Sequence, residues 1–257
     1  MLVAIIPCRR GDHLQEVVSK LGDATVVVVR DRCKVECDGV DDYVDVAQGD
    51  GFMAGYARDA GIDYVLDKYG FADGVLFIDE DCIPQDDLVK DHESALFRSI
   101  PVVSIGRRLE RGLGWKDPRE IGEAGQWNMF SSRGTVIQNA AWVTKCLATW
   151  SCNLGLNMPA VRLLRRAMLS VRKANRLFNP AFDGHWGGED AYLGYLAWSY
   201  RVPMAYLPRG ANAVKHMDHP RPLPEYGKGF TEILDSEVSY LRRYLMAHPL
   251  SIDDITP

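Results

Sequence analysis

The stretch that decides the fold is Gly74–Pro84, GVLFIDEDCIP. Its apolar part predicts a buried strand, which ends abruptly in Asp79, Glu80 and Asp81, with a proline shortly after. Because side chains alternate along a strand, we expect Asp79 and Asp81 to point the same way from the strand tip. Two carboxylates there predict a site for a divalent cation, and such a cation usually binds a phosphate as well. A D-x-D in isolation is more often a solvated acidic loop, so this interpretation depends on partners elsewhere in the chain.

Strand and helix signals alternate around this stretch. Buried strands that alternate with helices predict an α/β fold, in which helices flank a mostly parallel central sheet and a nucleotide binds at the carboxyl ends of the strands. The strands are expected over Leu2–Ile6, Thr25–Val29, Asp42–Val46, Val75–Ile78 and Pro101–Ile105, and the helices over Asp12–Leu21, Phe52–Tyr69 and Asp86–Phe97.

The second half is less regular. Residues 106–135 are glycine-rich and charged without periodicity, which is typical of a lid or a binding loop. After them we expect helices over Ala160–Leu177 and Glu189–Tyr200, short strands over Met204–Leu207 and Ala213–His216, and an amphipathic helix over Phe230–Ala247 that packs back on the body. The expected organisation is a catalytic domain over 1–220, with a nucleotide-binding half at 1–105 and an acceptor and catalytic half at 106–220. A C-terminal helical extension at 221–257 follows.

Composition narrows the class of protein. The 257 residues are 47% hydrophobic and 10% aromatic, enough for a packed core. No run approaches the roughly 20 apolar residues of a transmembrane helix, and the N-terminus has the pattern of a first strand without the basic region of a signal peptide. The six cysteines lack metal-ligand spacing, which indicates reduced thiols in a cytoplasmic protein.

The charge is distributed unevenly along the chain. The net charge is −5, yet no Asp or Glu occurs between Ala124 and Phe182. On a helical wheel, the basic residues of the helix expected at Ala160–Leu177 lie on one arc. They are Arg162, Arg165, Arg166, Arg172, Lys173 and Arg176. This basic stripe is either a solvated polar face or a surface for an anionic acceptor, such as a nucleic acid, a phospholipid headgroup at a membrane surface or a lipid-linked phosphate. Trp115, Trp127 and Phe130 would suit stacking on a base or sugar.

A second motif is Phe182–Asp190, FDGHWGGED. Gly187 and Gly188 permit a tight turn, and Glu189 and Asp190 then begin a helix, where the macrodipole favours their ionised forms. Trp186 offers a flat face for stacking on a sugar or base. The alternative is ordinary helix capping.

A third motif is Val214–Pro220, VKHMDHP. A histidine at the end of a short strand would complete the shell of the cation. His216 directly follows the strand-like run and is preferred over His219. A structural or surface role is the alternative for either histidine.

Together, these motifs resemble those of nucleotide-sugar-dependent glycosyltransferases of the GT-A fold, in the same order over most of residues 1–220. Asp79–Pro84 resembles the D-x-D motif. Trp186–Asp190 is similar to the W-G-G-E-D segment of the β-1,4-galactosyltransferase and polypeptide GalNAc-transferase branches, and His216 lies where those branches place a metal-binding histidine. The resemblance implies a Rossmann-like GT-A domain of the family 2 type.

Weaker similarities extend the resemblance. Leu2–Pro7 resembles the opening strand under the nucleobase, and Asp31 resembles the aspartate that contacts it, although the usual D-D-x-S pattern is absent. Ala57–Ile62 is similar to an A-R-N-x-G segment, with Asp in place of Asn. Ser151–Gly155 resembles an S-G-N segment near the donor sugar, with Cys152 in place of Gly.

The resemblance implies a role for each group. The donor would be a nucleotide sugar, with a UDP-hexose as the first candidate. It would contact Pro7, Arg9, Asp31, Arg58, Asp79 and Glu80. Mn²⁺ or Mg²⁺ held by Asp79, Asp81 and His216 would neutralise the leaving diphosphate. Asp190 would be the general base. Sugar hydroxyls would contact Asn153, Trp186, Gly187, Gly188 and Glu189. Retaining relatives tend to carry W-G-G-E-N, so Asp190 favours inversion.

Other functions stay open at this point. A glycosyltransferase acceptor could be a glycan, a lipid-linked sugar or modified DNA. A metal-dependent phosphohydrolase or nuclease would instead use Asp79, Asp81, Glu189 and Asp190 as metal ligands and would bind no sugar nucleotide. A non-catalytic carbohydrate- or nucleic-acid-binding module would keep its function without Asp190.

Overall fold

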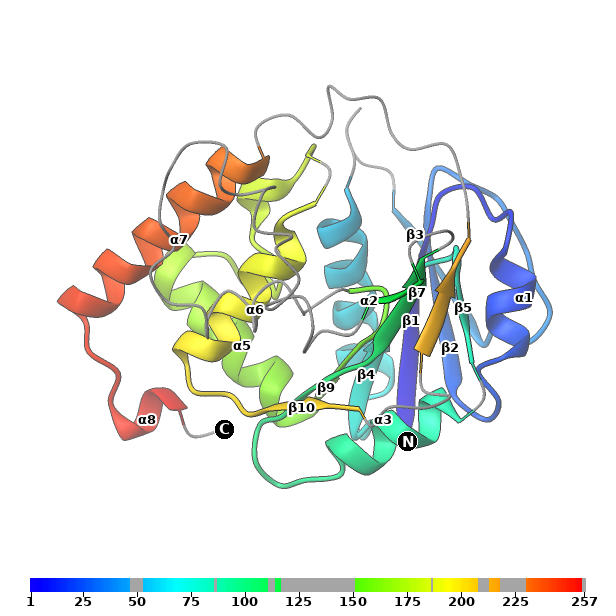
Figure 1. Cartoon of the computed structure of the whole chain (residues 1–257), viewed down its shortest axis with the longest axis horizontal. Helices are drawn as coiled ribbons and strands as arrows, with labels where there is room; N and C mark the ends of the chain where they lie inside the picture. Colours follow the sequence, from blue (N-terminus) through cyan, green and yellow to red (C-terminus); the bar gives the residue numbers. More distant parts are fainter. Residues whose placement is uncertain are drawn as a thin grey trace.

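In the computed structural model, the described residues are 1–46, 53–85, 87–110, 114–116, 151–185, 187–207, 213–217 and 230–255. They form a central sheet covered by helices on both faces and a smaller sheet beside it (Figure 1). The prediction of an α/β fold with a flanked central sheet is confirmed.

Within the described ranges, the central sheet has seven strands in the order β10-β6-β9-β4-β1-β2-β3. Their bounds are β1 Leu2–Cys8, β2 Thr25–Asp31, β3 Asp42–Val46, β4 Gly74–Phe77, β6 Val103–Ile105, β9 Leu154–Asn157 and β10 Met204–Tyr206. Strand β1 runs parallel to β2 and β4, and β2 runs parallel to β3. Strand β9 is antiparallel to both of its neighbours, β4 and β6. The sheet is therefore mostly parallel, as expected.

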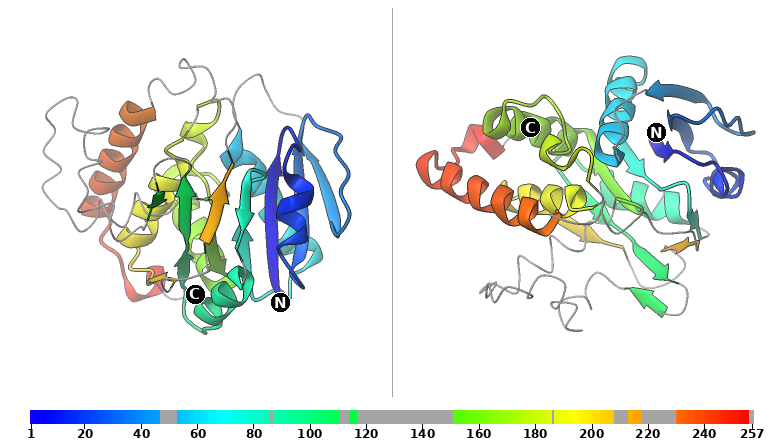
Figure 2. Two further views of the ribbon diagram at one scale, coloured as in Figure 1. Left: turned by 45° about the vertical axis from the view of Figure 1, so that its right-hand side comes forward. Right: turned by 90° about the horizontal axis from the view of Figure 1, so that it is seen from above.

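Alternation along the strands divides the core between the two faces of this sheet. Val3 and Ile5 of β1 belong to one hydrophobic cluster, whereas Ala4 and Ile6 belong to another. Helices α2 (Ala54–Lys68), α5 (Met158–Arg172), α6 (Glu189–Ser199) and α7 (Phe230–Ala247) cover the first face, and α1 (Leu14–Ser19) and α3 (Leu88–Leu96) cover the second. Figure 2 shows α7 and β1–β3 at opposite ends of the molecule. Helix α7 packs on the body through the first of these clusters.

The smaller sheet has the order β5-β11-β7-β8. Its strands are β5 Cys82–Pro84, β11 Ala213–His216, β7 Arg107–Glu110 and β8 Gly114–Lys116. Strands β7 and β8 lie in the segment that showed no periodicity and that we expected to be a lid or a binding loop, so part of that segment is regular. Residues 117–135, with Trp127 and Phe130, lie outside the described residues.

Helix α5 begins and ends differently from the sequence expectation. The Asn157 side chain caps its first turn by accepting a hydrogen bond from the backbone N–H of Ala160 at 3.1 Å. The helix ends at Arg172, because Lys173 adopts a left-handed conformation (φ 56°) that cannot continue it. The expectation that it runs to Leu177 is therefore wrong. The short helices η2 (Pro180–Phe182) and α8 (Ile252–Ile255) complete the described elements.

Candidate functional site

Arg58 connects two of the three sequence motifs. Its guanidinium lies 2.6 Å from a carboxylate oxygen of Asp79, which follows β4, and 3.1 Å from Glu189 at the start of α6. The Arg58 side chain is 3% exposed. Burial lowers the pKa of Arg58, but the carboxylates of Asp79 and Glu189 outweigh this effect and raise it overall. The guanidinium therefore stays charged and holds the D-E-D segment and α6 at fixed positions.

Glu189 and Asp190 form the first turn of α6. Gly187 and Gly188 precede them with φ of 88° and 94°, the left-handed conformation that glycine adopts without steric cost. Burial and the neighbouring Asp190 raise the pKa of Glu189 to about 7, although Arg58 opposes this. The turn thus places two carboxylates at the edge of the sheet: that of Glu189, which pairs with Arg58, and that of Asp190.

Asp190 is held by two backbone N–H groups. They come from Ser151 at 3.4 Å and from Ala191 at 2.7 Å, one on each carboxylate oxygen. Burial raises its pKa, and these hydrogen bonds and Arg58 oppose the shift. The structure therefore brings the Ser151–Gly155 segment to the G-G-E-D turn. Trp186 lies outside the described residues.

Asp81 and His216 lie together because β5 and β11 pair antiparallel, with Cys82 opposite His216. The Nε2 atom of His216 is 3.8 Å from Oδ2 of Asp81. Asp81, Cys82 and His216 each offer a ligand atom within 4.8 Å of the others. The expected pairing of Asp81 with His216 in space is thus observed, whereas His219 lies outside the described residues.

The expectation that Asp79 and Asp81 point the same way rested on strand alternation, and this basis is wrong. Strand β4 ends at Phe77, two residues before Asp79, so alternation does not extend to the carboxylates. Asp79 contacts Arg58, and its other close neighbours are Cys82 and Cys152. Asp79 and the Asp81–His216 pair belong to two candidate ligand groups that share Cys82.

Glu80 contacts the loop that follows β1. Its carboxylate accepts hydrogen bonds from the backbone N–H groups of Arg9 (3.1 Å), Arg10 (3.1 Å) and Gly11 (2.5 Å), and from the Cys8 thiol (3.1 Å). The donor contact that we expected for Glu80 stays a prediction. Its role is to hold the β1–α1 loop beside the strand ends.

Asp31 lies at the end of β2 and is buried. Arg9 lies 3.8 Å from its Oδ2 atom, and Arg32 lies 3.4 Å from Oδ1. Neither contact is a hydrogen bond to Oδ1, and among the described residues that buried oxygen has no hydrogen-bond partner. The structure therefore brings Asp31 and Arg9 together, and the Asp31 oxygen that lacks a hydrogen bond has an ionic contact with Arg32.

Asn153 has a structural position, contrary to the sugar contact expected for it. Its side chain is 0% exposed. The amide oxygen lies 2.8 Å from Nε2 of His92, and the amide nitrogen donates to the Arg107 carbonyl at 2.8 Å. A sugar hydroxyl cannot reach an atom enclosed in this way. The resemblance of Ser151–Gly155 to a sugar-binding segment therefore does not extend to this side chain.

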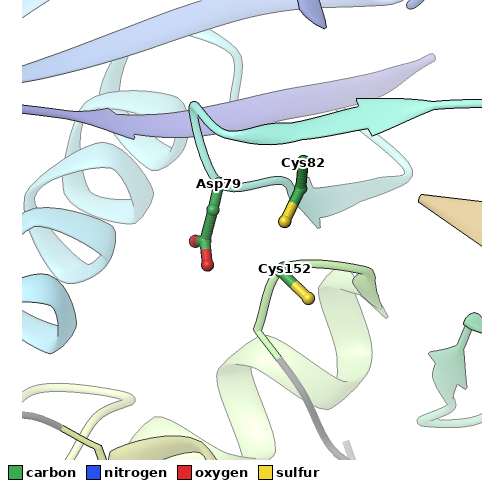
Figure 3. Close-up of side chains that lie close together, drawn as sticks. All are labelled: Asp79, Cys82 and Cys152. Carbon is green, nitrogen blue, oxygen red and sulfur yellow. The ribbon is translucent and has the colours of Figure 1, made fainter. Parts of the chain in front are cut away.

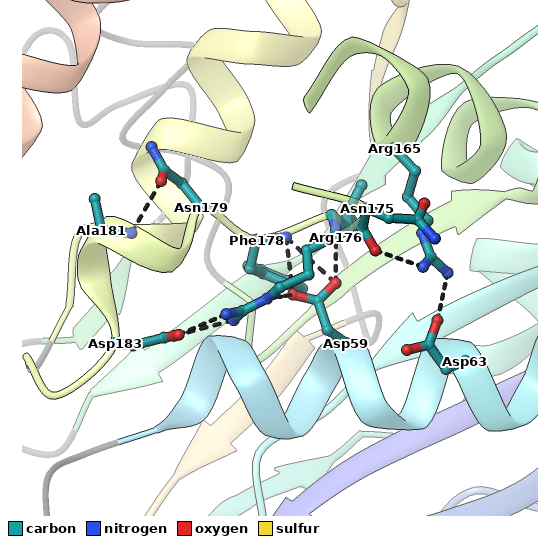
Figure 4. A network of polar contacts seen from close by, with 10 residues as sticks. Asp59, Asp63, Arg165, Asn175, Arg176, Phe178, Asn179, Ala181 and Asp183 are labelled. Atoms are coloured by element: carbon teal, nitrogen blue, oxygen red, sulfur yellow. Dashed lines mark hydrogen bonds and ion pairs between the residues drawn. The ribbon is translucent and has the colours of Figure 1, made fainter. Parts of the chain in front are cut away.

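The basic stripe of α5 meets acidic residues from other elements (Figure 4). Arg165 is 8% exposed, pairs with Asp63 of α2 at 2.7 Å and donates to the Asn175 carbonyl at 2.7 Å. Arg172 pairs with Glu237 of α7. The expected continuous basic surface is therefore wrong for these arginines. Arg162, Arg166 and Lys173 are exposed, and Arg166 also donates to the Asp253 carbonyl at 3.2 Å.

Arg176 and Asp59 extend this polar network toward the site (Figure 4). Asp59 of α2 accepts hydrogen bonds from Arg176 at 3.0 Å and from the backbone of Leu177 at 2.6 Å and Phe178 at 3.2 Å. Arg176 also makes a two-point contact with Asp183. The Asp that replaces the usual Asn in the A-R-N-x-G resemblance thus anchors the chain between α5 and η2.

By its sequence the chain matches no known protein family and no curated protein. Its fold is similar to that of GalNAc-T7 crystallised with UDP, GalNAc and Mn²⁺, with a TM-score of 0.54 at 13% identity over 97% of this chain and 50% of that one. It is also similar to S. aureus TarS 1-349 in complex with UDP-GlcNAc, with a TM-score of 0.59 at 11% identity over 98% of this chain and 77% of that one. The chain has the GT-A fold. It spans half the length of the GalNAc-T7 chain.

The GT-A fold accounts for the position of the motifs at one edge of the sheet. The loop after β1, the end of β2, the β4–β5 connection and the start of α6 all meet there. No described helix has both the length and the apolar composition needed to cross a membrane. The sequence analysis did not predict that the thiols of Cys82 and Cys152 lie at this edge. Cys152, which stands where the S-G-N segment has Gly, was the available sign of this.

Proposed function

We propose that the protein is a glycosyltransferase that moves a hexose from a nucleoside-diphosphate sugar, in the first place a UDP-sugar, to a hydroxyl group with inversion at the anomeric carbon. One observation carries this proposal: a single buried guanidinium, Arg58, joins Asp79 in the D-E-D segment to Glu189 in the G-G-E-D segment. Similar GT-A structures were crystallised with UDP and Mn²⁺ and with UDP-GlcNAc, which supports such a donor.

The donor nucleotide would bind at the ends of β1 and β2. Oδ1 of Asp31 has an ionic contact with Arg32 but no hydrogen bond, and it would accept one from an N–H of a nucleobase, because a buried acceptor without a hydrogen bond is costly. Arg9 lies beside this carboxylate, and Pro7 lies on the adjoining strand. Glu80 keeps the loop that carries Arg9 in place through three backbone hydrogen bonds.

The residues near β5 and β11 fit a divalent cation. Asp81 offers carboxylate oxygen and His216 offers imidazole nitrogen, with 3.8 Å between the two atoms. These residues would hold Mn²⁺ or Mg²⁺, and Asp79 would join them on leaving Arg58. When bound, the ion neutralises charge on the diphosphate.

Asp190 is the general base of this proposal. The N–H groups of Ser151 and Ala191 fix its carboxylate, and its raised pKa makes it a stronger proton acceptor than a carboxylate in water. It would take the proton of the acceptor hydroxyl as that oxygen attacks the anomeric carbon. Glu189 of the same turn and Arg58 of α2 would orient the sugar.

The acceptor in this proposal is a glycan, a lipid-linked sugar or modified DNA. If it is anionic, the exposed Arg162, Arg166 and Lys173 are the groups that we propose to contact it. Arg165 no longer belongs to this set, because its charge is buried against Asp63.

A phosphohydrolase or nuclease would gather its carboxylates around one metal position. Arg58 instead lies between Asp79 and Glu189, and the metal-ligand groups among the described residues contain neither Glu189 nor Asp190. The geometry therefore favours the glycosyltransferase.

Donor binding is tested by thermal melting with a panel of nucleotide sugars, with and without Mn²⁺ or Mg²⁺. We expect one nucleoside diphosphate and its sugar derivative to raise the Tm only when metal is present. Equal stabilisation without metal would remove the role of Asp81 and His216.

The base is tested by Asp190→Asn. This variant should bind the donor as the wild type does and lose at least about 100-fold in transfer, since general-base catalysis typically contributes ~10²–10⁴-fold. Exposed Asp63 provides a matched control, and Asp63→Asn should keep full turnover. Turnover by Asp190→Asn close to that of the wild type would rule out the assignment.

A further inference from the structure

Two thiols lie next to Asp79 at the edge of the sheet (Figure 3). Asp79 belongs to the connection between β4 and β5, Cys82 is the first residue of β5, and Cys152 precedes β9. The two sulfur atoms and a carboxylate oxygen of Asp79 all lie within 4.8 Å of one another. The thiols are 0% and 2% exposed, whereas the Asp79 side chain is 32% exposed. The cluster is therefore buried on its sulfur side and reachable from solvent past Asp79.

The donor atoms of this cluster differ in chemistry from those of Asp81 and His216. Two thiolates and one carboxylate favour a thiophilic ion such as Zn²⁺ over Mg²⁺ or Mn²⁺. Zinc also binds readily through three protein ligands with a water in the fourth position. Ligand atoms about 2.3 Å (sulfur) and 2.1 Å (oxygen) from one tetrahedral ion lie about 3.5–3.8 Å apart. Side-chain adjustments of about 1 Å would bring the three residues to that geometry.

We propose that Asp79, Cys82 and Cys152 form a binding site for Zn²⁺ that differs from the Asp81–His216 position in its two sulfur donors and competes with it for Cys82 and Asp79. On binding, each thiol releases its proton to solvent, both sulfurs coordinate as thiolates, and the Asp79 carboxylate moves from Arg58 to the ion. The oxidation state of every atom stays the same.

Occupancy of this site would change the neighbouring one in two ways. Cys82 belongs to both ligand groups, so an ion on the thiols removes its hydrogen bond to Asp81, which measures 3.4 Å. Arg58 loses Asp79 and keeps only Glu189 of its two carboxylate partners described above. Zn²⁺ is therefore expected to oppose donor binding. This last consequence rests on the proposed function, but binding of the ion does not.

The binding experiment uses the full chain after treatment with a chelator. Zn²⁺ is titrated in competition with a chromogenic chelator, and Co²⁺ is titrated while the thiolate-to-metal charge-transfer absorption is recorded. We expect one equivalent of Zn²⁺ and a thiolate band for the wild type and for the control Cys37→Ser, whose half-buried thiol lies outside the cluster. Cys152→Ser should lose at least tenfold in Zn²⁺ affinity and most of the band.

Two further variants keep the test decisive. Asp79→Asn should weaken Zn²⁺ binding even if Cys152→Ser fails to fold, which its melting curve without metal would show. His216→Ala should retain Zn²⁺ binding. The proposal is overturned if the wild type binds no Zn²⁺, if Cys152→Ser and Asp79→Asn bind it as the wild type does, or if only His216→Ala abolishes binding. Failure of every nucleotide sugar to bind would overturn the proposed function and leave the Zn²⁺ result standing.

Discussion

Arg58 is the residue on which the arrangement of the site depends most. A buried guanidinium loses most of its hydration, and here the carboxylates of Asp79 and Glu189 compensate. The same contacts fix the β4–β5 connection relative to α6. One side chain therefore affects both the stability of the fold and the geometry of the proposed donor site.

Arg58→Met tests this role, because methionine has a similar length and no charge. It leaves two carboxylates without their cation, and we expect the free energy of unfolding in urea to fall by about 3 kcal/mol. The partial exposure of Asp79 and the ability of Glu189 to take up a proton near its pKa of about 7 keep the loss from being larger. The control is Arg162→Met at an exposed position of α5, which should change stability by less than about 0.5 kcal/mol. Equal stability of Arg58→Met and the wild type would show that the network contributes nothing.

At the scale of elements, α3 joins β6 and β9 through a buried histidine. His92 is fully buried, with Nδ1 2.7 Å from Ser104 Oγ and Nε2 2.8 Å from Asn153 Oδ1. Burial lowers the pKa of His92 to about 4 from 6.5, although Asn153 opposes the shift. Neutral His92 therefore links a helix to two strands, one of which leads directly from the candidate site.

The lowered pKa makes stability depend on pH. Between about pH 6.5 and pH 4 the unfolded chain binds a proton at His92 that the folded chain does not, so stability falls as the pH is lowered through this window. At pH 5 the effect approaches about 2 kcal/mol. We expect urea unfolding of the wild type to lose about 2 kcal/mol more between pH 7 and pH 5 than unfolding of His92→Gln. The exposed His248→Gln should behave as the wild type, and identical pH profiles for all three proteins would contradict the prediction.

Elements with their own local signal were predictable, and those defined by distant partners were not. The apolar runs of β1, β2 and β4 and the spacing of α2 gave bounds within about two residues, because burial on both faces leaves a continuous signal. Strands β5 and β7 have three and four residues, and both pair with β11, which is distant in the sequence; β7 also pairs with β8. The helical wheel of α5 identified its basic face but not Asp63 or Glu237, since these acids come from other helices.

At the scale of the whole molecule, α7 connects the C-terminal part to the helical layer next to the site. Its residues Leu234, Val238 and Leu241 are buried in the cluster that includes α5 and α6. Glu237 is buried as well, accepts a hydrogen bond from Asn179 at 2.6 Å and pairs with Arg172 of α5. Arg172 in turn stacks on Tyr240, with 3.7 Å from its guanidinium carbon to the ring centroid. Glu237 of α7 thus holds α5 and the segment before η2 together.

Glu237→Ala separates this scaffolding role from the chemistry of the site. The change leaves Arg172 without the carboxylate described above and removes a buried hydrogen bond from Asn179, so the free energy of unfolding should fall by about 2 kcal/mol. Binding of a nucleotide sugar with Mn²⁺ below the melting transition should stay within about twofold of the wild type, since the described partners of Glu237, Asn179 and Arg172, are not site residues. The control Glu93→Ala removes the same charge from an exposed position of α3 and should be nearly neutral. If Glu237→Ala weakened donor binding as strongly as it lowered stability, α7 would have to act on the site directly.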